Sequence, residues 1–194
     1  NEEIIDASKR TLYEAKRMNQ MVIDMLELSS LESEKIINNE VNNLKDVTQN
    51  IINSYTLKLE DKHINLSTSL NDLNVKIPQK DLIHLISNLI DNAIKYTLPG
   101  SKICIRGIKK DGQAQISVAD NGPGISDEVK PHIFEMFYTG NNTIADSHRS
   151  LGLGLSLCRS IIEAHGGTLV LTDNIPRGCM FTFTLPLSEV ILNE

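Results

Sequence analysis

The sequence predicts an α+β protein: a two-layer α/β sandwich, in which helices cover one face of a mixed sheet, preceded by a long bundle-forming helix. Apolar residues recur at three- and four-residue steps through residues 2–34, without Gly or Pro. Two later pairs of segments alternate in polarity across short turns, which is typical of antiparallel hairpins. Helical patterns precede each hairpin, and together these observations indicate helices packed on a sheet.

The first predicted helix covers residues 2 to about 34. Its apolar seam consists of Ile5, Leu12, Ala15, Met18, Val22, Met25, Leu26 and Ser29. A lone helix of this length with so wide a seam needs partners, and a coiled coil or four-helix bundle would cover it. Packing of an amphipathic helix on its own domain is the alternative.

The composition indicates an ordinary globular protein. The chain has 194 residues, of which 40% are hydrophobic and 23% are charged, enough for one well-cored domain plus a small appendage. Its net charge of −6 argues against a nucleic-acid surface, so any phosphate ligand must be held by local groups. Cys104, Cys158 and Cys179 show no CxxC spacing, which favours reduced thiols in a cytosolic setting.

Turn residues and changes of period place the other elements along the chain. In order, they are an extended stretch at 39–41, a helix at about 44–59, strands at 63–69 and 73–77, a helix opening at 78–79, a hairpin of 102–108 and 113–119, a helix at 151–164, and a hairpin of 168–172 and 179–185. Residues 126–150 form a long polar loop with an apolar island at 133–138. Such a loop in a compact domain is usually a lid or binding loop, or is disordered.

Two short motifs carry groups that suit a nucleotide. On the helix after residue 79, Asn88 and Asn92 lie one turn apart, with Lys95 and Tyr96 following on nearly the same face. A carboxamide oxygen can ligate Mg²⁺, and an ammonium group can meet phosphate. Downstream, a strand ends in Asp120, whose carboxylate could accept the amino protons of an adenine. Each residue alone has an ordinary structural explanation, but their fixed order favours a nucleotide site.

A third motif is the glycine pair at Gly152 and Gly154, just before a helix. Glycines let backbone N–H groups approach an anion closely, and the helix offers its positive end. The segment is neither a Walker loop nor a dinucleotide fingerprint, and alone such a pair is more often a packing device. At the other end of that helix, His165 precedes two glycines and is expected to be a C-terminal cation near the helix dipole.

In this order, the motifs resemble the ATP-binding catalytic domain of bacterial two-component sensor histidine kinases, a domain of the Bergerat type. The resemblance covers essentially the whole chain: the N-box at 88–96, the DxGxG turn at 120–124, the aromatic F-box at 134–137, the glycine-rich loop at 152–155 and the terminal hairpin at 178–181. The sequences of residues 151–155 and 163–167 also resemble those of potassium-responsive sensor kinases. The resemblance implies that residues 1–36 are the second helix of a dimerisation hairpin and that residues 37–194 are the catalytic domain.

The resemblance also implies roles for single residues. Asn92 would ligate Mg²⁺, Asn88 and Lys95 would contact the phosphates, and Tyr96 would lie along the ribose and phosphates. Asp120 would fix the adenine amino group. The further nucleotide contacts that it implies are Gly122, Gly124, Ile125, Phe137, Arg149, Gly152, Leu153, Gly154 and Leu155.

The cofactors so implied are ATP and Mg²⁺, and the partners are a second copy of the chain, through the N-terminal helix, and the receiver domain of a response regulator. No nucleic acid is expected as a partner. The resemblance further implies a cytoplasmic portion of a membrane-bound sensor.

Two departures from the family pattern bear on activity. None of the five histidines is followed by the Glu/Asp-Leu-Arg-Thr-Pro of a phosphoacceptor helix, so the acceptor histidine is expected outside this sequence. Thr139 stands where the family usually has an Arg, which leaves Lys130, His148 and Arg149 as candidate cations of the loop.

Two alternatives to the kinase remain. One is an ATPase of the same fold; those relatives place a water-activating Glu one helical turn before the Mg²⁺-binding Asn, where this chain has Asn88, and an amide cannot take a proton. The other is a nucleotide-sensing interaction module with weak or no kinase activity.

Overall fold

The computed structural model describes residues 2–33, 40–139 and 152–188. The helices are α1 (Glu2–Ser33), α2 (Leu44–Ser54), α3 (Thr56–Asp61), α4 (Gln79–Tyr96) and α5 (Gly154–Ala164), with a short 3₁₀ helix, η1 (Lys130–His132). The strands are β1 (Val41–Asn43), β2 (Asn65–Leu70), β3 (Asn74–Lys76), β4 (Lys102–Lys110), β5 (Gln113–Asp120), β6 (Thr168–Asp173) and β7 (Cys179–Pro186).

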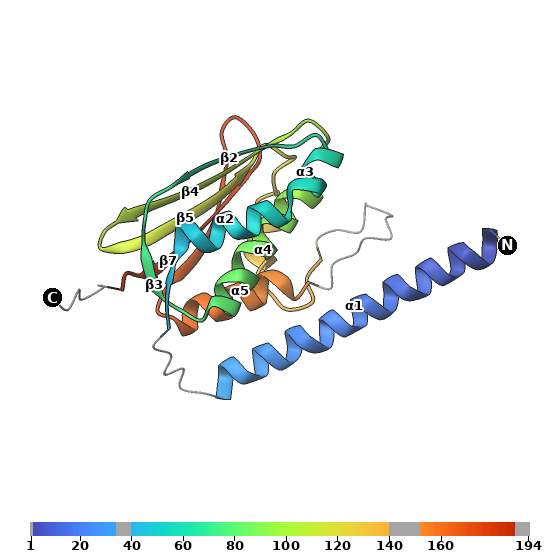
Figure 1. Cartoon of the computed structure of the whole chain (residues 1–194), viewed down its shortest axis with the longest axis horizontal. Coiled ribbons are helices and arrows are strands. Elements are labelled where there is room, and N and C mark those ends of the chain that lie inside the picture. Colours follow the sequence, from blue (N-terminus) through green and yellow to red (C-terminus); the bar gives the residue numbers. More distant parts are fainter. Residues whose placement is uncertain (1, 34–39, 140–151, 189–194) are drawn as a thin grey trace.

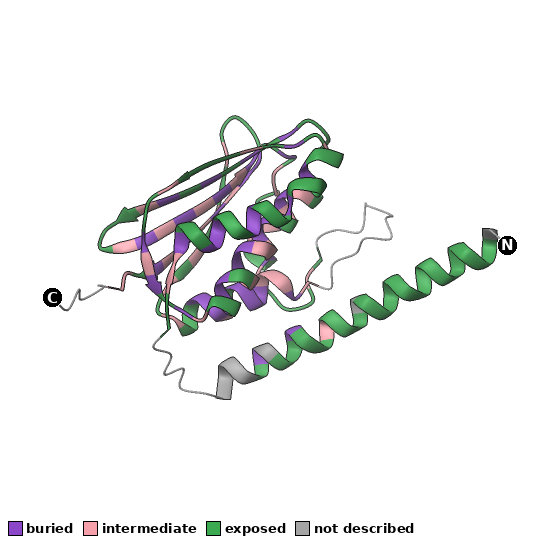
Figure 2. Ribbon diagram, in the orientation of Figure 1, coloured by how far each residue is buried: buried purple, intermediate pink, exposed green. Residues whose placement is uncertain are grey.

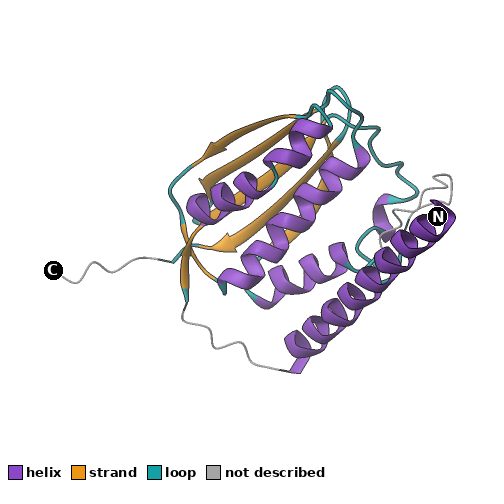
Figure 3. Ribbon diagram, turned by 45° about the vertical axis from the view of Figure 1, so that its right-hand side comes forward, coloured by secondary structure: helices purple, strands orange, loops and turns teal. Residues whose placement is uncertain are grey.

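The main sheet is mixed and has helices on one face (Figure 3). Its strand order is β2-β4-β5-β7-β6; β2 runs parallel to β4, and the other neighbours are antiparallel. Alternate residues of β5 and β7 are buried, as expected where one face of a sheet carries the core. The predicted two-layer α/β sandwich and both predicted hairpins are therefore confirmed.

Helix α4 forms the centre of the helical layer. Its buried stripe recurs every three or four residues and consists of Leu82, Leu85, Ile86, Leu89, Ile90 and Ala93. This spacing points one face of the helix at the core, and it leaves Asn88 and Asn92 half-buried beside the stripe. Burial of the apolar stripe thus positions the two amides at the edge of the core.

Three predicted boundaries are wrong, each because of the backbone. The single helix expected over residues 44–59 is divided at Tyr55, whose N–H donates to Ile52 O over 2.9 Å in a tightened turn. The strand expected from residue 63 begins only at Asn65, because His63 has a φ of 53°. The last helix begins at Gly154, since Gly152 has a φ of +72° and cannot continue a right-handed helix.

Helix α1 packs along α5 and leaves most of its surface exposed (Figures 1 and 2). Leu28 and Asp24 are buried, but the predicted seam residues Leu12, Met18 and Val22 are exposed. The apolar seam is therefore only partly covered within one chain. No helix of the described residues is long and apolar enough to cross a bilayer.

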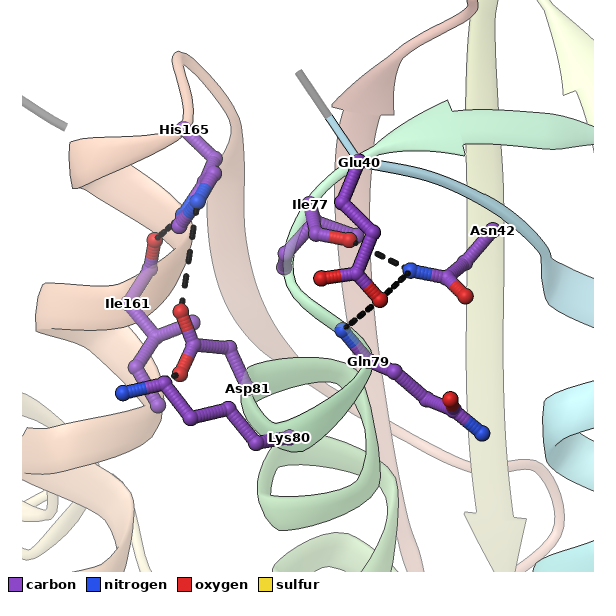
Figure 4. Close-up of polar contacts among 8 residues, drawn as sticks. All are labelled: Glu40, Asn42, Ile77, Gln79, Lys80, Asp81, Ile161 and His165. Atoms are coloured by element: carbon purple, nitrogen blue, oxygen red, sulfur yellow. Dashed lines mark hydrogen bonds and ion pairs between the residues drawn. The ribbon is translucent and has the colours of Figure 1, made fainter. Parts of the chain in front are cut away.

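A polar cluster holds the ends of α4 and α5 that lie away from the predicted site (Figure 4). Glu40 Oε1 accepts a hydrogen bond from the N–H of Gln79 over 3.2 Å, where Pro78 offers no capping side chain. His165, expected as a cation at the end of α5, is indeed its C-terminal cap, but its side chain is buried and its Nδ1 lies 2.8 Å from Ile161 O. Its Nε2 lies 4.0 Å from Asp81 Oδ2, and burial raises the pKa of Asp81.

Candidate nucleotide-binding site

The motifs that are far apart in the sequence meet around the C-terminal half of α4 and the start of α5. A Cβ added to Gly154 would lie 2.3 Å from Asn88 Oδ1, so the N-box touches the glycine-rich loop. A Cβ on Gly122 would lie 3.2 Å from Tyr96 O, which brings the DxGxG turn to the end of α4. The contacts form one continuous chain from the N-box to both glycine motifs.

The F-box joins this group through main-chain contacts. The N–H of Phe137 donates to Gly152 O over 3.0 Å, and a Cβ on Gly152 would lie 2.6 Å from the carbonyl carbon of Phe137. Phe134 packs edge-on against Phe181 of β7, with ring centroids 6.4 Å apart, whereas Phe137 is 54% exposed. Phe134 therefore anchors the segment to the core, and Phe137 faces outward beside the glycine loop.

Asp120 is held with one oxygen satisfied and one available. The N–H groups of Gly122 and Cys179 donate to its Oδ1 over 2.8 and 3.4 Å. Oδ2 makes no hydrogen bond within the described residues. The side chain is buried, and burial raises its pKa, although the two N–H donors partly offset this effect. A buried carboxylate with one unused oxygen is suited to accept protons from a ligand.

The β6–β7 hairpin supports Asp120 from behind. Asn174 Nδ2 donates to Asp120 O over 2.8 Å. A Cβ on Gly178, which has a φ of +120°, would lie 1.9 Å from the same carbonyl oxygen. The hairpin main chain thus approaches Asp120 so closely that only Gly fits at position 178.

Lys95 and Tyr96, which were predicted to meet phosphates and ribose, lie together at the end of α4. Both are exposed, and Lys95 Nζ lies 5.1 Å from the centroid of the Tyr96 ring. Leu153 differs, because its side chain is fully buried in the core and only its main chain could reach a ligand. Leu155 is also packed against the core and is partly buried.

Lys130 does not face the phosphates as a free cation. Its Nζ lies 2.6 Å from Asp127 Oδ1 and 2.7 Å from Asp173 Oδ2, and these carboxylates raise its pKa. Lys130, one of the three candidate cations of the loop, is thus already engaged by two carboxylates in this structure. The other two candidates, His148 and Arg149, lie outside the described residues.

A cavity of about 420 Å³ opens between the DxGxG turn and the β6–β7 hairpin. The predicted contacts Gly124 and Ile125 line it, with Asp173, Arg177 and Gly178 among the others. Neither Asp120 nor the amides of α4 line this cavity. Some predicted site residues thus contact one another around α4, and others line the neighbouring cavity.

Several residues near the site were not predicted from the sequence. Asn174 supports Asp120 across 54 residues of sequence, and no local pattern marks such a contact. Cys179 lies beside Asp120, and burial, followed by the charges of Asp120 and Asp173, raises the pKa of its thiol to about 11. This thiol stays protonated at neutral pH and is a poor nucleophile.

The sequence profile of one protein family matches residues 77–189; its description is "Histidine kinase-, DNA gyrase B-, and HSP90-like ATPase". The chain is 29% identical over 193 residues to the sensor protein KdpD of Clostridium acetobutylicum, covering 96% of this chain and 21% of that protein. It is 32% identical over 180 residues to the sensor histidine kinase RppB of a Synechocystis strain, covering 91% of this chain and 40% of that protein. The chain thus spans well under half the length of either relative.

Solved structures of the histidine kinase ThkA have the same fold. The nucleotide-free catalytic domain of ThkA matches with a TM-score of 0.65 and 29% identity, over 76% of this chain and 95% of that chain. ThkA in complex with the response regulator protein TrrA matches with a TM-score of 0.71 and 25% identity, over 90% of this chain and 49% of that chain.

Proposed function

Because the chain belongs to the histidine kinase-, DNA gyrase B- and HSP90-like ATPase family, as the order of its motifs predicts, we propose that it is the catalytic domain of a sensor histidine kinase. In this proposal it binds Mg²⁺-ATP and transfers the γ-phosphoryl group to a histidine on a dimerisation helix. The phosphoryl group then passes to a response regulator. The observation that carries the proposal is the continuous contact chain from Asn88 to the two glycine motifs.

The residue at position 88 favours transfer to an external acceptor over hydrolysis. Asn88 Oδ1 lies at the start of α5, next to Gly154, where the phosphates would meet the positive end of the helix. A carboxylate there could activate water, but an amide cannot accept its proton. Phosphoryl transfer asks the protein chiefly for positioning and charge neutralisation, and these are what the amides, Lys95 and the backbone N–H groups could supply.

Magnesium would be held jointly by Asn92 and by the nucleotide. The described residues contain no group of three or more His, Cys, Asp or Glu side chains arranged to hold a metal. Mg²⁺ commonly takes few protein ligands and completes its shell with phosphate oxygens and water, so a single amide oxygen fits this mode. When bound, the ion would neutralise phosphate charge.

Asn92→Ala should remove most of the Mg²⁺-dependent part of nucleotide affinity, whereas Asn92→Asp should spare it, since aspartate keeps an oxygen ligand. Calorimetric titration of each variant with an ATP analogue, with and without Mg²⁺, gives the comparison. Equal losses in the two variants would argue against direct ligation by Asn92.

The proposed partners follow from α1 and from the relatives. The exposed apolar seam of α1 suits a second copy of the chain, with residues 1–36 as part of a dimerisation hairpin and 37–194 as the catalytic domain. A response regulator is proposed because ThkA, a structural relative, was solved in complex with one. A cytoplasmic position within a membrane-bound sensor is also part of the proposal; the names of the relatives support the sensor role alone.

A nucleotide-sensing module without kinase activity is the second candidate. Lys130 is engaged by two carboxylates, and the exposed Thr139 is uncharged. Within the described part of the loop after Ile125, this leaves the phosphates without the cation that a kinase of this family would offer there.

Incubation with labelled ATP and a separately supplied phosphoacceptor hairpin distinguishes these candidates. We expect an acid-labile label on the hairpin histidine and none on this chain, because none of its histidines has the acceptor context. Inorganic phosphate without labelled hairpin would indicate an ATPase, and nucleotide binding without either product would indicate the sensing module. An acid-labile label on any of the five histidines would contradict the assignment of an external acceptor.

A further inference from the structure

Asp91, on α4 between the two site amides, is held by two residues from the neighbouring helical segment. Tyr55 Oη donates to Asp91 Oδ2 over 2.8 Å, and Lys58 Nζ donates to Asp91 Oδ1 over 3.1 Å. Lys58 Nζ also lies 4.7 Å from the centroid of the Tyr55 ring. Both carboxylate oxygens of Asp91 are therefore engaged by the neighbouring helical segment.

Tyr55 is the stronger of the two anchors. It is 8% exposed, and burial, followed by the charge and hydrogen bond of Asp91, raises its pKa well above the usual value for tyrosine. Its hydroxyl therefore remains protonated and donates to a charged acceptor, which makes a stronger bond than a neutral pair. The Lys58–Asp91 pair is more than half exposed on both sides and contributes less.

A second anchor holds the C-terminal end of the same helix. Lys62 Nζ donates to Ile94 O and, over 3.3 Å, to Lys95 O. These carbonyls belong to the last turn of α4, where helix carbonyls lack partners within the helix and an ammonium is favoured by the dipole. The donor thus fixes the main chain at the point where Lys95 and Tyr96 begin.

The contacts to Asp91 and to the end of α4 determine in which direction the side chains of Asn88 and Asn92 point. Residues of an α-helix are about 100° apart, so Asp91 lies roughly 60° from Asn88 and about 100° from Asn92 around the axis. The buried stripe of α4 is apolar and non-directional, and such packing tolerates small rotations better than hydrogen bonds do. The bonds to Asp91 therefore define the rotation of α4, and with it where both amides point.

We propose that Tyr55 is a positioning residue of the nucleotide site, which acts through Asp91 to hold Asn88 and Asn92 toward the phosphates. Lys58 and Lys62 assist it from α3 and from the residue that follows. The expected change in nucleotide affinity rests on the proposed function. The expected change in the orientation of α4 can be measured without a nucleotide. Asp120 lies at the end of β5 and not on α4, so a rotation of α4 should not move it. Binding of the adenine base, which Asp120 is proposed to hold, should therefore be unaffected.

The test compares Tyr55→Phe with Thr48→Val. Tyr55→Phe keeps the ring and removes only the hydroxyl that bonds Asp91. Thr48→Val removes a buried hydroxyl from α2, which bonds Leu44 O within its own helix, and so controls for a general loss of stability. Asp91→Asn, at a half-exposed position, provides a second variant should Tyr55→Phe not fold.

The first readout needs no ligand. The side-chain amide resonances of Asn88 and Asn92, observed by nitrogen–proton NMR, should shift in Tyr55→Phe and in Asp91→Asn and stay in place in Thr48→Val. Unmoved resonances in Tyr55→Phe, or equal shifts in the control, would overturn the positioning role, whatever the protein binds.

The second readout separates the phosphate half of the site from the base. Affinity for a Mg²⁺-bound non-hydrolysable ATP analogue should fall about twofold to tenfold in Tyr55→Phe, while affinity for adenosine stays unchanged. In the double variant Tyr55→Phe/Asp91→Asn the loss should be smaller than the sum of the two single losses, because the two substitutions share the Tyr55–Asp91 contact. Equal losses for the analogue and adenosine would contradict the inference. Shifted amides without any nucleotide binding by the parent chain would instead contradict the proposed function.

Discussion

Asp120→Asn should weaken the binding of adenine nucleotides about tenfold to a hundredfold, while the protein stays folded. The asparagine keeps an oxygen to accept from Gly122 N–H, as Asp120 Oδ1 does over 2.8 Å. It then presents an NH₂ group where the unused Oδ2 offered an acceptor to the adenine amino group. A hydrogen bond to a charged group contributes about 1.5–3 kcal/mol, which gives the expected range.

The same substitution should raise stability at neutral pH. Burial raises the pKa of Asp120 in the folded state above its unfolded value of about 3.9, so the folded carboxyl binds its proton more tightly. The favourable contribution of the protonated group is complete below about pH 4 and is lost as pH rises through the folded pKa. Asparagine does not ionise, so the variant does not lose this stability as pH rises. Its free energy of unfolding should therefore exceed that of the parent at about pH 7 and equal it near pH 4.

Urea unfolding at the two pH values and calorimetric titration with ATP measure these effects. Unchanged ATP affinity would show that Asp120 does not hold the base. If the variant were less stable than the parent at neutral pH, the ionised Asp120 carboxylate would not destabilise the fold, and the argument from its burial would be wrong.

Gly178→Ala should destabilise the fold much more than Gly100→Ala, a substitution at another turn glycine. Its φ of +120° is strained for any L-residue, and the new Cβ would lie 1.9 Å from Asp120 O and 2.8 Å from Asn121 Cα. Backbone strain costs about 1–3 kcal/mol and overpacking about 1–3 kcal/mol, so the expected loss is about 2–6 kcal/mol. Because the colliding atoms are main chain, relief requires moving Asp120, and ATP affinity should fall as well.

Gly100→Ala is the matched control. Gly100 also has a positive φ, +81°, but a Cβ there would meet no atom within 4 Å. Its substitution should therefore cost only the backbone term and should leave ATP affinity unchanged. Similar denaturation midpoints for the two variants would show that the close approach of the hairpin to Asp120 is not a constraint.

The elements that repeat a period were predictable from the sequence, and the contacts between elements were not. The alternation in β5 and β7 and the three- and four-residue spacing in α4 state directly which face is buried. The break at Tyr55 has no such signal, and neither does the hydrogen bond from the Tyr55 hydroxyl to Asp91, which lies 36 residues away. Local propensity favours a continuous helix there, and the structure has a tightened turn between Ile52 and Tyr55 instead.

The site shows the same division. The order of Asn88, Asn92, Asp120 and the glycines indicates a nucleotide, but their roles stay predictions until a ligand is measured. Lys130 was interpreted from its charge alone, and its partners Asp127 and Asp173 neutralise it. Only one of these is near in sequence; the other is 43 residues away, on β6. A cation's function depends on which carboxylates reach it, and that is set by tertiary structure.

The central claim is that the motifs around α4 form one Mg²⁺-ATP site. Calorimetric titration of the chain with a non-hydrolysable ATP analogue, in the presence and absence of Mg²⁺, tests it most directly. We expect one nucleotide per chain, a dissociation constant between micromolar and millimolar, tighter binding with Mg²⁺, and displacement by ADP. An absence of binding at millimolar analogue, with the protein shown to be folded, would contradict the account.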